Sequence, residues 1–124
     1  MIFVLLVTSN KAKQLLHIRF LGNVQILEFQ SAREDIRTEL KGLSPGFRYW
    51  ADFSQLESMG LECVPEIGGV MEMLAGVGVG MVVRFIPDPS KDIGMNILAA
   101  FHYPKDLQVI NCATLGDVAR SLNF

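Results

Sequence analysis

The stretch that decides the fold is residues 47–86, FRYWADFSQLESMGLECVPEIGGVMEMLAGVGVGMVVRFI. Two apolar segments within it, Phe47–Phe53 and Met81–Ile86, have the length and composition of buried strands. Between them the pattern predicts a helix from about Leu61 to Ala75. Such a strand-loop-helix-strand unit is typical of a parallel sheet, and the loop at the carboxyl end of its first strand is where these sheets usually bind ligands or partners.

Glycine and proline mark both ends of that helix. Pro65 suits the first turn, where its missing N–H group is not needed. The segment Gly76-Val77-Gly78-Val79-Gly80 predicts a helix stop followed by a turn. It does not predict a dinucleotide-binding loop, because that loop follows a strand and opens a helix.

In the rest of the chain, predicted strands also alternate with predicted helices. A turn is predicted at Gly22-Asn23. The periodicity predicts further strands at 2–7, 14–20 and 107–111, and further helices at 25–41, 91–101 and 114–121. We therefore expect one α/β domain over residues 1–124, with element order β-β-α-β-α-β-α-β-α. Its five-stranded sheet should be mainly parallel, with an antiparallel first strand.

Charge and composition exclude several classes of function. The net charge is −2 and there is no basic run, so nucleic-acid binding is not predicted. The apolar segment Met1–Val7 is read as a strand rather than a signal peptide, and no apolar run reaches the ~20 residues of a membrane span. Two cysteines are too few for a disulfide framework. We expect a cytoplasmic protein.

Three of the predicted strands, the second, third and fourth, each carry a basic residue within an otherwise apolar pattern: Arg19, Arg48 and Arg84. We expect helices to cover one face of the sheet well and to leave the other, with these arginines, partly open. Taken singly, each arginine is read as lying over apolar surface with its charged head in water. Taken together with Trp50, they predict a surface for a protein partner or a second copy of the chain.

A short motif follows the first strand of the opening stretch. Asp52, Ser54, Leu56 and Met59 match the pattern D-x-S-x-[apolar]-x-x-[Met/Ile]-D-S-S-G, and the Gly-rich turn and Val-rich strand at 78–83 follow at the matching distance. In this motif and in its element order the chain resembles the STAS domain of the bacterial anti-sigma factor antagonists. The resemblance implies a STAS-like fold and protein partners, such as a regulatory kinase-like protein or a member of a sigma-factor pathway.

The chain departs from that family at the motif that carries the family's regulatory phosphorylation site. The family's D-S-S-G is replaced by Gly60-Leu61-Glu62-Cys63, so its phosphorylated serine falls on Leu61, which has no hydroxyl. The resemblance therefore implies a diverged member without the phosphoserine switch. Glu62 is read as an ordinary first-turn carboxylate, with a permanently charged mimic as the alternative. Ser54 and Ser58 are read as turn or capping residues rather than phosphorylation sites.

The sequence contains little that indicates a catalytic or metal-binding site. Cys63 is the best candidate nucleophile because a helix N-terminus can lower a thiol pKa, but a buried, inert thiol is the favoured interpretation. His17 and His102 show no metal-ligand spacing, and no cofactor motif is present.

The sequence thus predicts a non-enzymatic protein-interaction domain without a cofactor. The alternative is a carrier of a small apolar ligand held near Met71 and Met73, although methionine there is more often core filler. The predicted partner-binding residues are Ser54, Ser58, Gly60, Leu61, Glu62, Trp50, Arg48 and Arg84.

Overall fold

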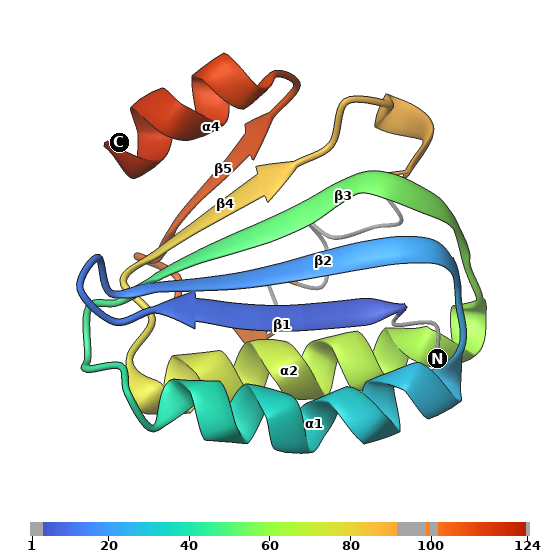
Figure 1. Ribbon diagram of the computed structural model, residues 1–124, viewed down its shortest axis with the longest axis horizontal. Helices are drawn as coiled ribbons and strands as arrows, with labels where there is room; N and C mark the ends of the chain where they lie inside the picture. The colour runs from blue at the N-terminus through green and yellow to red at the C-terminus, as the bar shows by residue number, and fades with distance from the viewer. Residues whose placement is uncertain (1–3, 92–98, 100–101, 124) are drawn as a thin grey trace.

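The computed structural model of the chain describes residues 4–91, 99 and 102–123, and these form one five-stranded sheet with helices packed on it (Figure 1). The strands lie in the order β1-β2-β3-β4-β5; β1 is antiparallel to β2 and every other pair is parallel, which confirms the predicted fold class. The helix predicted at 91–101 falls almost entirely outside the described residues. The elements are β1 (Leu5–Asn10), β2 (Leu15–Val24), α1 (Ile26–Leu40), β3 (Arg48–Met59), the 3₁₀ turn η1 (Leu61–Cys63), α2 (Val64–Val77), β4 (Met81–Phe85), the 3₁₀ turn η2 (Pro89–Lys91), β5 (Gln108–Cys112) and α4 (Leu115–Leu122).

The strand order explains which face each helix covers. Parallel neighbours are joined by right-handed crossovers, and the order from β2 to β5 never reverses, so α1 and α2 must lie on the same face. We call this the inner face. The helix α4 follows the last strand, is not a crossover, and packs on the opposite, outer face against β4 and β5 (Figure 1).

The inner face carries the main hydrophobic core. Alternate residues of β2 and β3 point into it, as the sequence pattern predicts, and they meet the apolar stripes of α1 and α2. The central members of this core are Leu16, Ile18, Phe20, Phe29, Ile36, Phe47, Tyr49, Ala51, Phe53, Ile67, Leu74 and Val82.

The strands β2 and β3 are longer than predicted. β3 continues through Met59 and β2 through Val24, because the two pair in parallel along their whole length. Two register shifts interrupt this pairing, and Gly22 takes a positive φ of 66° within it. The turn predicted at Gly22-Asn23 and the loop predicted to begin at Ser54 are therefore wrong: both segments are irregular strand.

The glycine-rich segment after α2 ends the helix as predicted. Gly78 has a φ of 95°, and its N–H donates to the carbonyl oxygens of Leu74 and Ala75. The N–H of Val79 also donates to Leu74 O, at 3.0 Å. These bonds satisfy the last carbonyl groups of α2 and turn the chain into β4.

On the outer face a smaller apolar cluster lies under α4. The N-cap of α4 is Thr114, and its hydroxyl accepts a hydrogen bond from the Asp117 N–H at 3.1 Å. The cluster combines Leu15, Val83, Phe85, Cys112, Val118 and Leu122. Within the described part of the chain, no helix is both long and apolar enough to cross a lipid bilayer.

Candidate functional site: the end of β3 and the start of α2

The motif at the carboxyl end of β3 is held by a local hydrogen-bond network. Asp52 Oδ1 accepts bonds from the Ser54 N–H at 2.9 Å and the Ser54 hydroxyl at 2.6 Å. The His17 imidazole lies 3.8 Å from the other carboxylate oxygen. Burial acts to raise the pKa of Asp52, but the His17 and Ser54 contacts outweigh it and hold that pKa below its ordinary value. Both the N–H and the hydroxyl of Ser54 are thus engaged by Asp52.

The next predicted residue, Ser58, lies on the exposed last part of β3. Its hydroxyl donates to Asn23 Oδ1 of β2 at 2.6 Å, across the parallel strand pair. Gly60 follows with extended backbone, and its carbonyl accepts the Cys63 N–H at 3.0 Å to close η1. Ser58 and Gly60 therefore set the direction in which the chain enters α2.

Among the residues that the structure describes, Leu61 is the most exposed large apolar side chain. It is 84% exposed, and Glu62 beside it also faces solvent. A leucine of this exposure gains nothing from the fold itself, since burial is what stabilises an apolar side chain. The structure places Leu61 and Glu62 together on one open surface.

Cys63 is buried, in contrast to its two neighbours. Its side chain is fully enclosed, and its sulfur lies 3.8 Å from the Val24 carbonyl oxygen. Burial raises the pKa of the Cys63 thiol, and the carboxylate of Glu62 raises it further. A nucleophilic cysteine needs a lowered pKa, so the structure favours the interpretation of Cys63 as a core residue.

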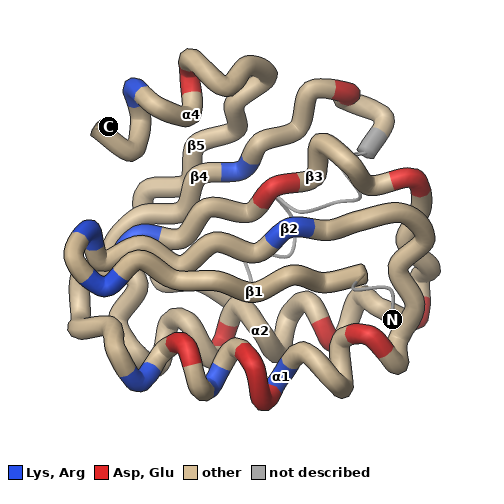
Figure 2. The backbone as a smooth tube through the Cα atoms, in the orientation of Figure 1, with Lys and Arg blue, Asp and Glu red and all other residues tan. Residues whose placement is uncertain are grey.

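Charge is unevenly distributed over the molecule (Figure 2). Basic residues gather at the β1–β2 turn, whereas the opposite end, where β3 runs into η1, carries acidic residues. There the first turn of α1 contacts η1 and adds Leu27, which is 67% exposed. We call this region the edge surface and define it by Leu27, Glu57, Ser58, Gly60, Leu61 and Glu62.

Two other predicted site residues, Trp50 and Arg48, lie on the outer face. Trp50 is half-buried and stacks on His17, with ring centroids 4.0 Å apart and an angle of 10° between the planes. Arg48 donates to the carbonyl oxygens of Lys13, at 2.7 Å, and Leu122. Both residues hold the sheet and α4 together, and neither belongs to the edge surface.

The third predicted arginine, Arg84, lies on the other side of the sheet. It pairs with Ala51 in the β3–β4 register and therefore points to the inner face, where it is 2% exposed. The prediction that it shares an open face with Arg48 and Trp50 is wrong. The sequence shows the alternation along β4 correctly, but only the pairing with β3 determines which set of residues faces α2.

Sequence reasoning also does not indicate the positions of two residues, the exposed Leu27 of the edge surface and the buried Tyr103. Leu27 follows a helix start that the pattern leaves ambiguous, so its exposure could not be read from periodicity. Tyr103 lies just after the helix predicted at 91–101, and it is buried near Arg84, which the pattern of that helix does not indicate.

Comparison with known proteins rests on structure alone, because the sequence matches no protein-family model and no curated protein. An uncharacterized protein of the DUF3478 family with a SpoIIAA-like fold, from Shewanella loihica PV-4, superposes with a TM-score of 0.70. The match covers 95% of this chain and 91% of that one, at 11% sequence identity.

Two anti-sigma factor antagonists superpose over similar lengths. SpoIIAA in its unphosphorylated form gives a TM-score of 0.64 at 17% identity, covering 96% of this chain and 97% of SpoIIAA. An antagonist from Mycobacterium paratuberculosis gives 0.60 at 18% identity, covering 97% and 93%. These identities are low enough that the likeness concerns the fold and not the activity. The chain has the SpoIIAA-like fold of STAS domains.

Proposed function

We propose that this chain is a non-enzymatic protein-interaction domain that binds a protein partner through the edge surface. The observation that carries the proposal is the 84% exposure of Leu61 at the first position of η1. An exposed apolar side chain on a rigid turn, held by the Ser58 and Gly60 hydrogen bonds, is a suitable anchor for an interface.

The charge around Leu61 indicates the kind of partner. Glu57 and Glu62 are exposed close to it, and Glu66 is paired with Arg33 of α1 at 2.7 Å. An apolar centre with a carboxylate rim fits a partner that offers an apolar pocket bordered by lysine or arginine. A kinase-like or sigma-pathway protein of that surface chemistry is the partner that the family resemblance suggests.

The proposal includes the absence of a phosphate switch at Leu61. The position that the resemblance equates with the phosphorylated serine has no hydroxyl in this chain. The nearby hydroxyls of Ser54 and Ser58 are both engaged with side chains, of Asp52 and Asn23 respectively. Binding at the edge surface would then be governed by the amount of partner rather than by phosphorylation of residue 61.

The test replaces Leu61 by a photo-crosslinking amino acid in cells, with the same replacement at Leu115 as the matched control. Leu115 is also an exposed leucine, at 60%, but it lies on α4 across the sheet. We expect one discrete cross-linked species from position 61, none from position 115, and loss of the species when Glu57 and Glu62 are both changed to lysine.

Size-exclusion chromatography of the purified chain distinguishes a foreign partner from self-association. A cross-linked species of twice the chain's mass, with a dimer in solution, would identify a homodimer that uses the edge surface. No adduct at position 61 together with a monomer in solution would overturn the proposal.

A further inference from the structure

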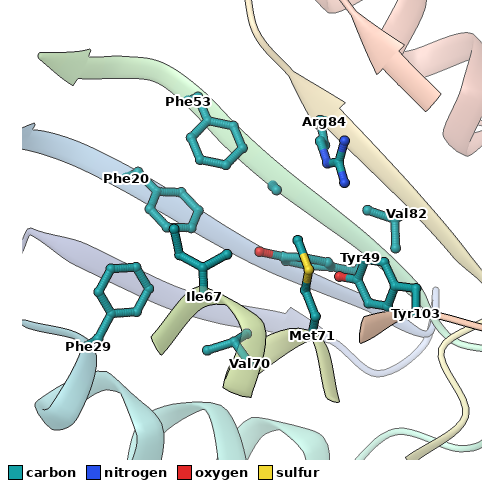
Figure 3. A pocket seen from close by; sticks show the side chains of 11 residues that line it. Phe20, Phe29, Tyr49, Phe53, Ile67, Val70, Met71, Val82, Arg84 and Tyr103 are labelled. Atoms are coloured by element: carbon teal, nitrogen blue, oxygen red, sulfur yellow. The ribbon is translucent and has the colours of Figure 1, made fainter. Parts of the chain in front are cut away.

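The structure contains a small enclosed cavity and a larger open groove, and only the groove has room for a side chain of another molecule. The cavity lies between the inner face of the sheet and α2, and its volume of about 30 Å³ has room for about two water molecules (Figure 3). The groove has a volume of about 240 Å³ and lies at the surface, between the C-terminal ends of α1 and α2.

This groove, which we call the helix-end groove, has an apolar floor and a basic rim. The floor is formed by Leu40 of α1 and by Met73 and Val77 of α2. The rim is formed by Arg37 and Lys41. Met73 and Val77 are only half-buried, so apolar surface stays open to solvent at this place. An open apolar surface with a polar rim is typical of an interaction site.

The cations of the rim are free to meet a carboxylate from outside. Lys41 is exposed, and its side chain makes no ion pair or hydrogen bond with a residue that the structure describes. Arg37 pairs with Glu34 one turn earlier, but an exposed pair of this kind contributes little and is easily exchanged. A third cation lies close by, since a Cβ at Gly42 would be 2.1 Å from Lys11 Cε.

The opposite end of the same two helices carries the complementary surface. Both α1 and α2 begin at the carboxyl end of a strand and connect parallel strands, so the edge surface lies at their N-terminal ends (Figures 1 and 2). Leu61 is 84% exposed there. The Glu62 carboxylate lies beside it, because a Cβ at Gly60 would be 2.3 Å from Glu62 Oε1. An apolar side chain with a carboxylate at one end thus matches an apolar groove with cations at the other.

The helix dipoles explain the charges at the two ends but not the apolar groups. Acidic residues near a helix N-terminus and basic residues near its C-terminus are favourable within one chain, and α1 follows this rule with Glu28 and Arg37. Apolar side chains respond to burial and not to the dipole. The exposed Leu61 and the open floor of the groove therefore need another explanation, and one contact that buries both supplies it.

We propose that the edge surface of one copy of this chain docks into the helix-end groove of a second copy. Leu61 then contacts the apolar floor, and Glu62 pairs with Arg37 and Lys41 of the other copy. The proposal rests on the proposed function and names a second copy as one partner of the edge surface. A partner of another kind at the same surface would compete with it.

The two surfaces in this contact are different, so the contact is heterologous. A pair of copies keeps one unused edge surface and one unused groove, and further copies can add at both. The result is a ring if the rotation between copies closes, and a filament if it does not.

The test measures the weight-average mass of the purified chain by sedimentation equilibrium at concentrations up to about 1 mM, because an interface with one apolar anchor is weak. We expect the mass to rise with concentration and not to level off at the dimer. A monomer at every concentration, or a dimer that grows no further, would overturn the proposal.

Two variants separate the two surfaces. Leu61→Asp disrupts the edge surface, and Arg37→Glu combined with Lys41→Glu reverses the charge of the groove. Each variant alone should stay monomeric where the original chain associates, whereas an equal mixture should form dimers and nothing larger, because one productive contact remains between them. Leu115→Asp and Arg120→Glu change an exposed leucine and a similarly paired arginine on α4, and both should associate like the original chain. A mixture that stays monomeric would refute the contact.

Photo-crosslinking at position 61 distinguishes this inference from the proposed function. In the Arg37→Glu, Lys41→Glu background the species of twice the chain's mass should disappear, and an adduct with a different protein should remain. An adduct with a different protein from a chain that is always monomeric would overturn this inference and leave the proposed function in place. No adduct at all, together with a monomer, would overturn both.

Discussion

At the scale of single residues, Arg48 connects three parts of the chain. Its guanidinium binds the carbonyl oxygen of Lys13 in the β1–β2 turn and that of Leu122 at the end of α4, while its own strand lies at the centre of the sheet. Carbonyl groups at a helix C-terminus lack partners within the helix, so a cation there is favourable.

We expect Arg48→Ala to lower the free energy of unfolding by about 1–3 kcal/mol, since it removes charged hydrogen bonds from a half-buried position. Urea denaturation measures the loss. Arg120→Ala is the control, because that exposed arginine pairs only with Asp117 one turn away, and such pairs contribute under about 0.5 kcal/mol. Equal losses for the two variants would show that Arg48 has no special role.

Asp52 gives a prediction about pH. Its pKa in the folded protein lies below the ordinary value of 3.8, so its ionisation favours folding. This contribution is complete above the ordinary pKa and is lost as the pH falls through the lower, folded-state pKa. Asp52→Asn should therefore be less stable than the original chain at pH 7, by under about 1 kcal/mol.

The same difference should disappear in acid. Urea denaturation of both proteins, from pH 7 down to the lowest pH at which they still fold, measures this difference in the free energy of unfolding. A difference that stays constant, or that grows as the pH falls, would contradict the role assigned to the Asp52 carboxylate.

At the scale of elements, the two glycines at the end of α2 differ in whether a residue with a side chain could replace them. A Cβ at Gly76 would meet nothing within 4 Å, in ordinary helical backbone. A Cβ at Gly78 would lie 3.0 Å from Pro45 Cβ, and the φ of 95° is one that other residues rarely adopt. Only the second glycine is required by the fold.

Alanine at the two positions should have opposite effects. We expect Gly76→Ala to raise the free energy of unfolding by up to about 1 kcal/mol, through helix propensity and reduced freedom of the unfolded chain. Gly78→Ala should lower it by about 1–2 kcal/mol. Thermal denaturation of both variants checks this matched pair, and a shift of the same sign in both would refute it.

Elements also show how far sequence reasoning reaches. The apolar runs of β3 and β4, the stripe of α2 and its glycine stop are encoded locally, and these predictions are confirmed. The second half of β3 was missed because Ser54, Gln55, Glu57 and Ser58 form a polar run that locally resembles a loop. Its strand conformation comes from pairing with β2, which is a long-range interaction. The inward direction of Arg84 was missed for the same reason, since it depends on register.

At the scale of the whole molecule, the strand order leaves the outer face to a single described helix. Both Val118 and Leu122 of α4 are almost fully buried there, against Val83 and Phe85 of the sheet. The half-buried Trp50 packs against this cluster, and it is the one tryptophan of the chain. Its fluorescence therefore reports how well α4 is seated.

We expect Leu122→Ala to lower the free energy of unfolding by about 2–4 kcal/mol, because it leaves a cavity in a closely packed cluster. The Trp50 emission should move to longer wavelength as water reaches the outer face. Leu115→Ala, at an exposed position of the same helix, should change either quantity little. An unchanged Trp50 emission in Leu122→Ala would show that α4 does not protect this side of the sheet.

The position of α4 after all five strands has a consequence during synthesis on the ribosome. A nascent chain that has emerged as far as β5 already contains Val83 and Phe85, but not the helix that covers them. Until α4 emerges, one side of the sheet presents a contiguous apolar area, which is the kind of surface that chaperones bind and that aggregates. Ribosome-bound chains that end at Cys112 and carry a linker long enough to bring β5 out of the exit tunnel should therefore recruit a chaperone. Chains that carry the same linker after Leu122 should no longer bind it.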